Sequence, residues 1–158
     1  MPKYQTEIFF PYSVQKIHNM VADIEKYPEF LPNCSHLIIK NSQKTPDSGQ
    51  KGGKKRVFLA EMGVKFSVFS EKFDSNVEID DMFHEINVTL NSGPLKNLIN
   101  NWKFETADNN GCIAHFSLQV EMKNLPLRLA LAAAFKIGVK DIEQAFITRA
   151  NKLYSTDN

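Results

Sequence analysis

The chain contains few of the residues that build catalytic and metal centres. It has two cysteines, Cys34 and Cys112, and four histidines among 158 residues. None of them has the close spacing of a zinc site or of an HExxH motif. A nucleophile elbow, a P-loop and a dinucleotide-binding glycine fingerprint are also missing. We therefore expect no catalytic residue, no metal and no catalytic cofactor, and we expect two free thiols in a reducing compartment.

An excess of charge of one sign and a long apolar run are missing too. Lys and Arg number 19, Asp and Glu number 18, and the net charge is +1. This balance provides no overall attraction to nucleic acid, so we expect no DNA partner. The sequence shows no apolar run long enough to span a bilayer and no leader segment, which favours a cytoplasmic protein.

Alternating apolar and polar residues predict a largely antiparallel sheet in one domain of residues 1–158. Phenylalanine is frequent, with twelve residues against four tyrosines and one tryptophan. An Asp-Asn-Asn-Gly turn at 108–111 predicts a hairpin between the last two strands. We expect strands at 4–10, 37–40, 57–62, 65–73, 85–90, 100–106 and 113–122.

Two helices complete this α+β plan of six to seven strands. Ser13 is a good N-cap for a short helix after the first strand, and Asn124 for a long one over 126–153. One face of the long helix is apolar, and Lys136 and Lys140 lie opposite. A single helix is only about 10 Å across and leaves a gap over a wide sheet, where we expect the ligand.

Two apolar segments and one basic cluster lie outside this plan. Pro28 and Pro32 make residues 27–34 a rigid apolar corner, and residues 93–99 form a second apolar loop. We place Phe30, Leu31, Leu95 and Leu98 at a cavity mouth or membrane contact, with a buried structural turn as the alternative for the second loop. The basic cluster consists of Lys51, Lys54, Lys55 and Arg56. We interpret it either as a solvated hairpin tip or as a site for anionic lipid or ribosomal RNA.

Four motifs, in order along the chain, resemble one known family. They are residues 11–13, 27–34, 93–104 and 145–150. Together they are similar to the coenzyme Q-binding proteins of the START-like, or helix-grip, superfamily, in its polyketide cyclase and lipid-transport branch. Bacterial ribosome-association toxins share these motifs. The resemblance extends over residues 3–154.

The resemblance implies a curved antiparallel sheet that grips the long C-terminal helix around an apolar tunnel. It further implies ubiquinone, or a related isoprenoid lipid, delivered for respiration and quinone biosynthesis with transient contact to a membrane surface. Mitochondrial members carry a leader that this chain lacks, so we expect a bacterial protein. The alternative is a toxin that binds the large ribosomal subunit and blocks subunit joining. An aromatase/cyclase is a third interpretation.

Strand alternation and the apolar helix face select the residues expected to contact the ligand. A register slip of one residue would turn every strand residue to the other face of the sheet. The candidates are Trp102, Phe104, Phe116, Leu118, Val120, Leu131, Phe135, Ile142 and Phe146.

Overall fold

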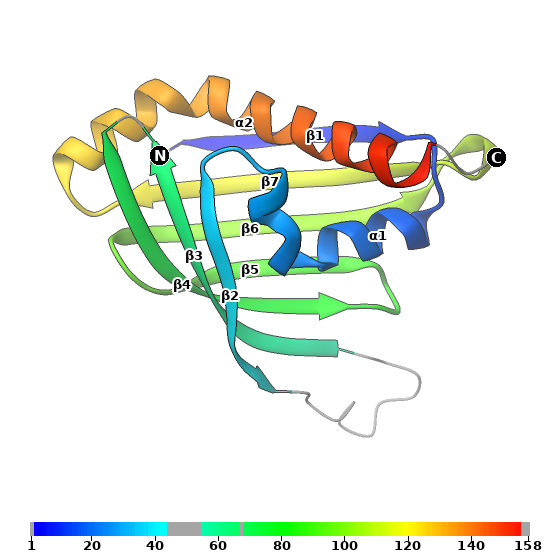
Figure 1. The fold of residues 1–158 in the computed structure, drawn as a ribbon, viewed down its shortest axis with the longest axis horizontal. Coiled ribbons are helices and arrows are strands. Elements are labelled where there is room, and N and C mark those ends of the chain that lie inside the picture. The colour runs from blue at the N-terminus through cyan, green and yellow to red at the C-terminus, as the bar shows by residue number, and fades with distance from the viewer. Residues whose placement is uncertain (1, 44–54, 67, 156–158) are drawn as a thin grey trace.

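The computed structural model describes residues 2–43, 55–66 and 68–155. Its elements follow one another as one strand, two short helices, six strands with a 3₁₀ turn before the last, and one long helix (Figure 1). They are β1 (Lys3–Phe10), α1 (Val14–Ala22), η1 (Ile24–Glu29), β2 (Cys34–Gln43), β3 (Lys55–Phe66), β4 (Phe69–Asp80), β5 (Glu85–Ser92), β6 (Leu95–Thr106), η2 (Asp108–Asn110), β7 (Cys112–Met122) and α2 (Leu125–Tyr154).

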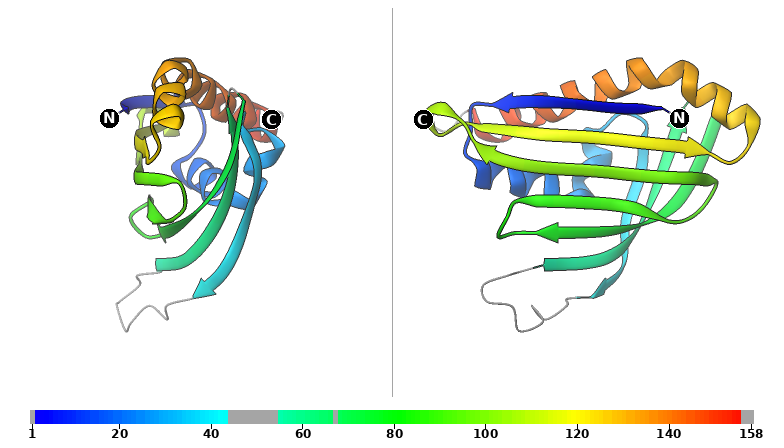
Figure 2. Two further views of the ribbon diagram at one scale, coloured as in Figure 1. Left: turned by 90° about the vertical axis from the view of Figure 1, so that its left-hand side faces the viewer. Right: turned by 180° about the vertical axis from the view of Figure 1, so that it is seen from behind.

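The strands form a single antiparallel sheet in the order β1-β7-β6-β5-β4-β3-β2. The sheet bends strongly, so that β2 and β3 turn toward the side on which β1 and β7 lie (Figure 2). Helix α2 lies across the open side of this curve, and α1 and η1 cover one end (Figures 1 and 2). The predicted α+β helix-grip architecture is confirmed.

Side-chain caps set the beginning of both α-helices as the sequence predicts. The Ser13 hydroxyl accepts a hydrogen bond from the Lys16 N–H at 3.2 Å. The Asn124 side chain accepts one from the Leu127 N–H at 3.0 Å, and Pro126 occupies the first turn of α2. Each cap satisfies a backbone donor that the helix itself leaves without a partner.

The predicted proline corner forms the 3₁₀ helix η1 and the turn after it. Pro28 lies inside η1, and the Leu31 N–H bonds the Tyr27 carbonyl at 2.8 Å. Asn33 then takes a positive φ of 69°, a conformation that asparagine tolerates better than most residues. Asn33 and Lys65 exchange hydrogen bonds of 2.6 and 2.8 Å, which attach the corner to β3.

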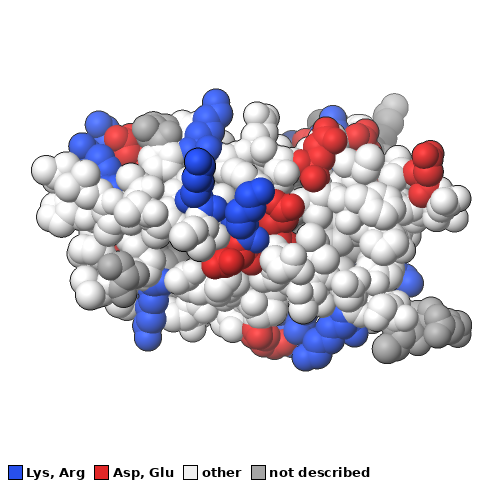
Figure 3. All heavy atoms as spheres, turned by 90° about the horizontal axis from the view of Figure 1, so that it is seen from above, with Lys and Arg blue, Asp and Glu red and all other residues white. Residues whose placement is uncertain are grey.

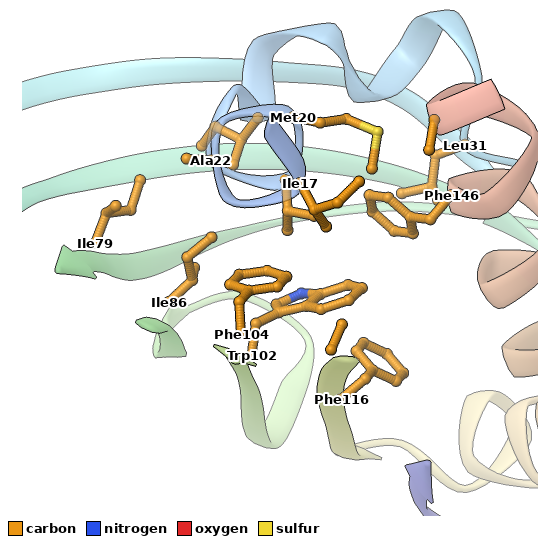
Figure 4. Close-up of a cluster of buried hydrophobic side chains, with 14 of the residues drawn as sticks. Ile17, Met20, Ala22, Leu31, Ile79, Ile86, Trp102, Phe104, Phe116 and Phe146 are labelled. Carbon is orange, nitrogen blue, oxygen red and sulfur yellow. The ribbon is translucent and has the colours of Figure 1, made fainter. Parts of the chain in front are cut away.

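An aromatic cluster joins the C-terminal half of α2 to the sheet (Figure 4). The Phe146 ring lies 5.0 Å from the Trp102 ring and 5.5 Å from the Tyr27 ring, both edge to face. Trp102 also contacts Phe116 at 4.6 Å between ring centroids. Edge-to-face pairs of this kind add about 0.5–1.5 kcal/mol each beyond the burial of their surface.

A buried histidine attaches α1 to the turn between β4 and β5. His18 is fully buried, and its Nε2 lies 2.9 Å from Asp81 Oδ1. A carboxylate only accepts, so Nε2 carries the hydrogen. Arg56 donates to both Asp81 oxygens at 2.8 and 2.9 Å. His84 lies in this turn with a φ of 57°.

The environment of His18 opposes protonation of its ring. Its Nδ1 is buried without a hydrogen-bond partner, so a proton added there has no acceptor. Burial lowers the pKa of His18 below 6.5 and outweighs the opposing effect of the Asp81 carboxylate, which raises the pKa. The nearby His84 and Arg56 lower the pKa further. The folded state therefore takes up a proton less readily than the unfolded state.

We expect this histidine to make the fold sensitive to mild acid. Its contribution to the free energy of unfolding is complete above about pH 6.5 and decreases as the pH falls below that value, because the unfolded chain binds the proton more readily. His18→Gln, which keeps a donor for Asp81 but does not titrate, should flatten the dependence between about pH 7.5 and 5.5 in urea unfolding. His115→Gln, on the outer face of the sheet, is the control. Equal slopes for wild type and His18→Gln would contradict the prediction.

Candidate ligand-binding cavity

A cavity of about 470 Å³ lies between α2 and the concave face of the sheet. Its wall is formed by residues of β2 to β7, by η1 and the corner after it, and by α2. Most of these side chains are aliphatic or aromatic. The gap that one helix leaves over a curved sheet is therefore present and apolar.

Eight of the nine predicted ligand contacts line this cavity. The strand residues are Trp102, Phe116, Leu118 and Val120, and the helix residues are Leu131, Phe135, Ile142 and Phe146. The predicted inward faces of the last two strands and of the long helix therefore agree with the structure. Contact of these residues with a ligand stays a prediction.

Phe104 is the exception, because the prediction that it lines the cavity is wrong. It is 3% exposed and does not line the cavity, although it shares the inward face of β6 with Trp102. Its ring stacks on Trp102 at 5.6 Å and meets the His18 ring edge to face. Helix α1 covers this end of the sheet, so Phe104 belongs to the closed core.

The predicted position of the cavity mouth, at Phe30, Leu31, Leu95 and Leu98, is wrong. Leu31, Leu95 and Leu98 do line the cavity, but they are 8, 1 and 6% exposed and so form part of its closed wall. Phe30 lies outside the lining, between Phe146 at 5.3 Å and the Arg149 guanidinium at 5.0 Å.

A β-bulge explains how both leucines of the second loop face inward. Leu95 and Leu98 are three residues apart and would face opposite sides of a regular strand. The pairing of β6 with β7 shifts between Leu95 and Asn97, and the extra residue turns both leucines to the same side. They pack with Met122 and Leu127 in a second apolar cluster.

The cavity opens instead between the middle of α2 and the corner after η1. Ile137 lines the cavity and is nevertheless 70% exposed. Asp141 on the helix and Asn33 on the corner also line it and are exposed. Sequence reasoning missed Ile137 because it lies next to Lys136 on the predicted polar face.

Residues of β3 and β4 were missed as well. Met62, Val64, Phe66 and Phe73 all line the cavity. Their alternation with polar neighbours, such as Lys65 and Lys72, was the signal that could have identified them.

Three polar side chains lie deep in the cavity wall. The Tyr27 hydroxyl donates to the Val21 carbonyl at 2.5 Å, and burial raises the pKa of this phenol, which stays neutral. Ser75 is 4% exposed, and Asn100 donates from Nδ2 to the Ser117 carbonyl at 2.8 Å. Ser75 and Asn100 lie two strands apart, on β4 and β6, with β5 between them.

The lining offers little for acid–base chemistry. Its titratable side chains are the neutral Tyr27 and Asp141, which is exposed at the opening. Such catalysis needs a group that titrates near the working pH and touches the reacting atoms. The arrangement is suited to holding an apolar molecule and to hydrogen-bonding one polar end of it.

Neither cysteine lines the cavity, and the described members of the basic cluster, Lys55 and Arg56, do not line it either. Both cysteines are free and buried, and burial raises the pKa of Cys34 to about 11 and of Cys112 to about 12. Lys51 and Lys54 fall outside the described residues. Lys55 lies 3.9 Å from Glu78, and Arg56 is engaged by Asp81.

The described residues show no group of three or more potential metal ligands. Within the same residues, no helix combines the length and the apolar character needed to cross a membrane.

Comparison with known proteins agrees with this geometry. The profile of the family described as "Polyketide cyclase / dehydrase and lipid transport" matches residues 10–147. The chain belongs to this family. It is similar in structure to a START superfamily protein from Mycobacterium smegmatis, with a TM-score of 0.72, 17% identity, and coverage of 96% of this chain and 98% of that one. The START-like resemblance predicted from the motifs is confirmed.

Two curated relatives represent the two functional groups that the sequence resembles. The ribosome association toxin RatA of Escherichia coli K12 is 32% identical over 155 residues, covering 98% of this chain and 90% of the relative. The mitochondrial coenzyme Q-binding protein COQ10 of Dictyostelium discoideum is 29% identical over 150 residues, covering 93% of this chain and 68% of the relative. This chain is therefore similar both to a protein named as a ribosome association toxin and to one named as a coenzyme Q-binding protein.

Gly138 provides a direct test of the open space beneath α2. A Cβ built on this residue meets no atom within 4 Å. We therefore expect Gly138→Ala to raise the free energy of unfolding by about 1 kcal/mol, the usual preference for alanine within a helix. Urea unfolding followed by circular dichroism would measure the change.

Gly93→Ala is the matched contrast. Gly93 has a φ of +134°, and a Cβ there would lie 2.6 Å from Phe73 Cβ. This variant should lose stability. A loss of stability in Gly138→Ala as well would show that the space beneath α2 is filled.

Proposed function

We propose that the protein is a non-enzymatic carrier that binds an isoprenoid lipid, ubiquinone or a close relative, in the cavity under α2. The main support is the cavity of about 470 Å³, with its apolar wall and its few polar groups. This volume lies in the range of about 300–1,000 Å³ of ligand pockets. It suits a ring with a short part of its tail, while a long polyprenyl tail would leave through the opening at Ile137.

The polar side chains of the wall supply the selectivity in this proposal. Burial of a tail is worth about 0.8 kcal/mol per CH₂ relative to water, but the tail gains little when it leaves a bilayer, which is already apolar. Discrimination must therefore come from the polar head and from cavity shape. Ser75 and Asn100 are the groups that we assign to the carbonyl or methoxy oxygens of a quinone head.

The comparisons support the same class of ligand. The family description includes lipid transport, and one relative is named as a coenzyme Q-binding protein. Delivery of the quinone for respiration and for quinone biosynthesis would follow from such a role.

Association with the large ribosomal subunit is the second candidate function. The observation in its favour is the 32% identity to RatA over nearly the whole chain. Binding to ribosomal RNA would require an accessible basic surface and would weaken strongly between low and moderate salt. In the described part of the predicted basic cluster, Lys55 lies near Glu78 and Arg56 is bound by Asp81.

Mass spectrometry of an organic extract from the purified native protein tests the carrier function. We expect ubiquinone in near-stoichiometric amount from the wild type. Leu118→Trp, which places a larger side chain in the cavity, should lose it. Ile99→Trp lies on the same sheet at a position that is 44% exposed and should keep it.

Either of two results would count against the carrier. One is an empty wild-type extract, and the other is equal recovery from Leu118→Trp. An empty extract combined with salt-sensitive cosedimentation with large ribosomal subunits would establish the second candidate instead.

A further inference from the structure

The N-terminal half of α2 has an apolar face toward solvent as well as toward the cavity. Leu125 is 57% exposed, Leu129 is 62% exposed and Ile137 is 70% exposed. Ala133, also exposed, continues the same stripe at a spacing of four residues. In Figure 3, which looks down on α2, the surface over this half of the helix, on the left, is mostly free of charged side chains.

The C-terminal half of the same helix provides an internal comparison. Its exposed face carries Lys140, Asp141, Gln144 and Thr148. A helix on the surface of a protein needs only one apolar face, the one that packs inward. The continuous second apolar stripe thus belongs to the half of α2 that covers the cavity, where Leu131 and Phe135 form the inner face. In the C-terminal half, Leu153 is exposed at 40% without such neighbours.

The turn between β3 and β4 adds a second exposed apolar group beside this helix. Val68 is 90% exposed, and Phe66, two residues before it, lines the cavity. The end of this hairpin lies close to the N-terminal half of α2 (Figures 1 and 2). We call Val68, Leu125, Leu129 and Ile137 the apolar rim; of these, Ile137 also lines the cavity.

Exposed lysines lie next to residues of the apolar rim. Lys65 on the hairpin and Lys136 beside Ile137 are exposed, and neither belongs to an ion pair among the described residues. Lys140 is also exposed and lies 6.0 Å from the Tyr4 ring centroid. The exposed acidic group at the opening is Asp141. An exposed apolar surface bordered by cations is the combination that binds an anionic lipid surface.

We propose that the apolar rim docks on a bilayer that contains anionic lipid, with the N-terminal half of α2 in the interface. The further role of the rim, as the surface through which a ligand enters, rests on the lipid-binding function proposed above. We assign a lipid surface as the partner of the rim because Ile137 belongs both to the rim and to the cavity opening. A lipid tail could then pass between the acyl chains and the cavity without crossing water.

Vesicle flotation tests this surface with the whole chain. The probes are phosphatidylcholine vesicles with and without phosphatidylglycerol. We expect the wild type to float with the anionic vesicles, and Val68→Glu/Leu129→Glu to bind at least about tenfold more weakly, because two apolar groups no longer enter the interface. Neither residue lines the cavity, so ligand recovery in an extract should be retained.

Phe9→Glu/Phe83→Glu is the matched control. These phenylalanines are 57 and 66% exposed and lie outside the rim. The control pair should float like the wild type. A Val68→Trp variant adds a second readout: its emission should shift to the blue on anionic vesicles, beyond any change of the buried Trp102.

The outcomes separate docking from the carrier function. Wild-type protein that does not float, or rim variants that float equally well, would overturn docking, whatever the extract contains. Flotation that depends on the rim, with an empty extract, would keep docking and reject the carrier. Rim variants that float normally but no longer cosediment with ribosomes would assign the rim to the ribosome instead.

Discussion

The structure depends on how one helix is attached to a sheet much wider than itself. Phe146 anchors the C-terminal half of α2 through its contacts with Trp102 and Tyr27. The hydrogen bonds between Asn33 and Lys65 attach the corner after Tyr27 to β3. Beyond this anchor, α2 continues over the concave face with space beneath Gly138. At the other end of the helix, Leu127 packs with Leu95, Leu98 and Met122. The cavity thus lies between two anchored ends of α2.

This arrangement explains why the same residues serve stability and a proposed function. Phe146, Trp102 and Phe116 are core residues by burial and cavity residues by position. The wall offers hydrogen bonds from few polar groups and carries no titratable pair, so affinity would arise from apolar burial and selectivity from the head group. The exposed outer face of α2 extends the same apolar character from the cavity to the surface of the protein.

Several features could be predicted because they depend on local chemistry. The caps at Ser13 and Asn124 need only a side-chain oxygen at the right position. The strand faces follow from alternation, which is why eight of nine proposed contacts line the cavity. Phe104 could not be separated from them, because its exclusion depends on α1, which is remote in sequence and covers that end of the sheet.

The sequence by itself determined the helix caps, the inward strand faces and the family, since periodicity, caps and turn residues act within a few residues of one another. Two element boundaries were wrong: β3 continues to Phe66 through the predicted break between residues 62 and 65, and β6 begins at Leu95 inside the predicted loop 93–99. Only the tertiary structure decided where the cavity opens, which leucines are buried and which cations are engaged. A bulge in β6 turns Leu95 and Leu98 inward, and Asp81, distant in sequence, binds Arg56. Such outcomes depend on partners that meet only when the sheet curves, and spacing along the chain does not encode that curvature directly.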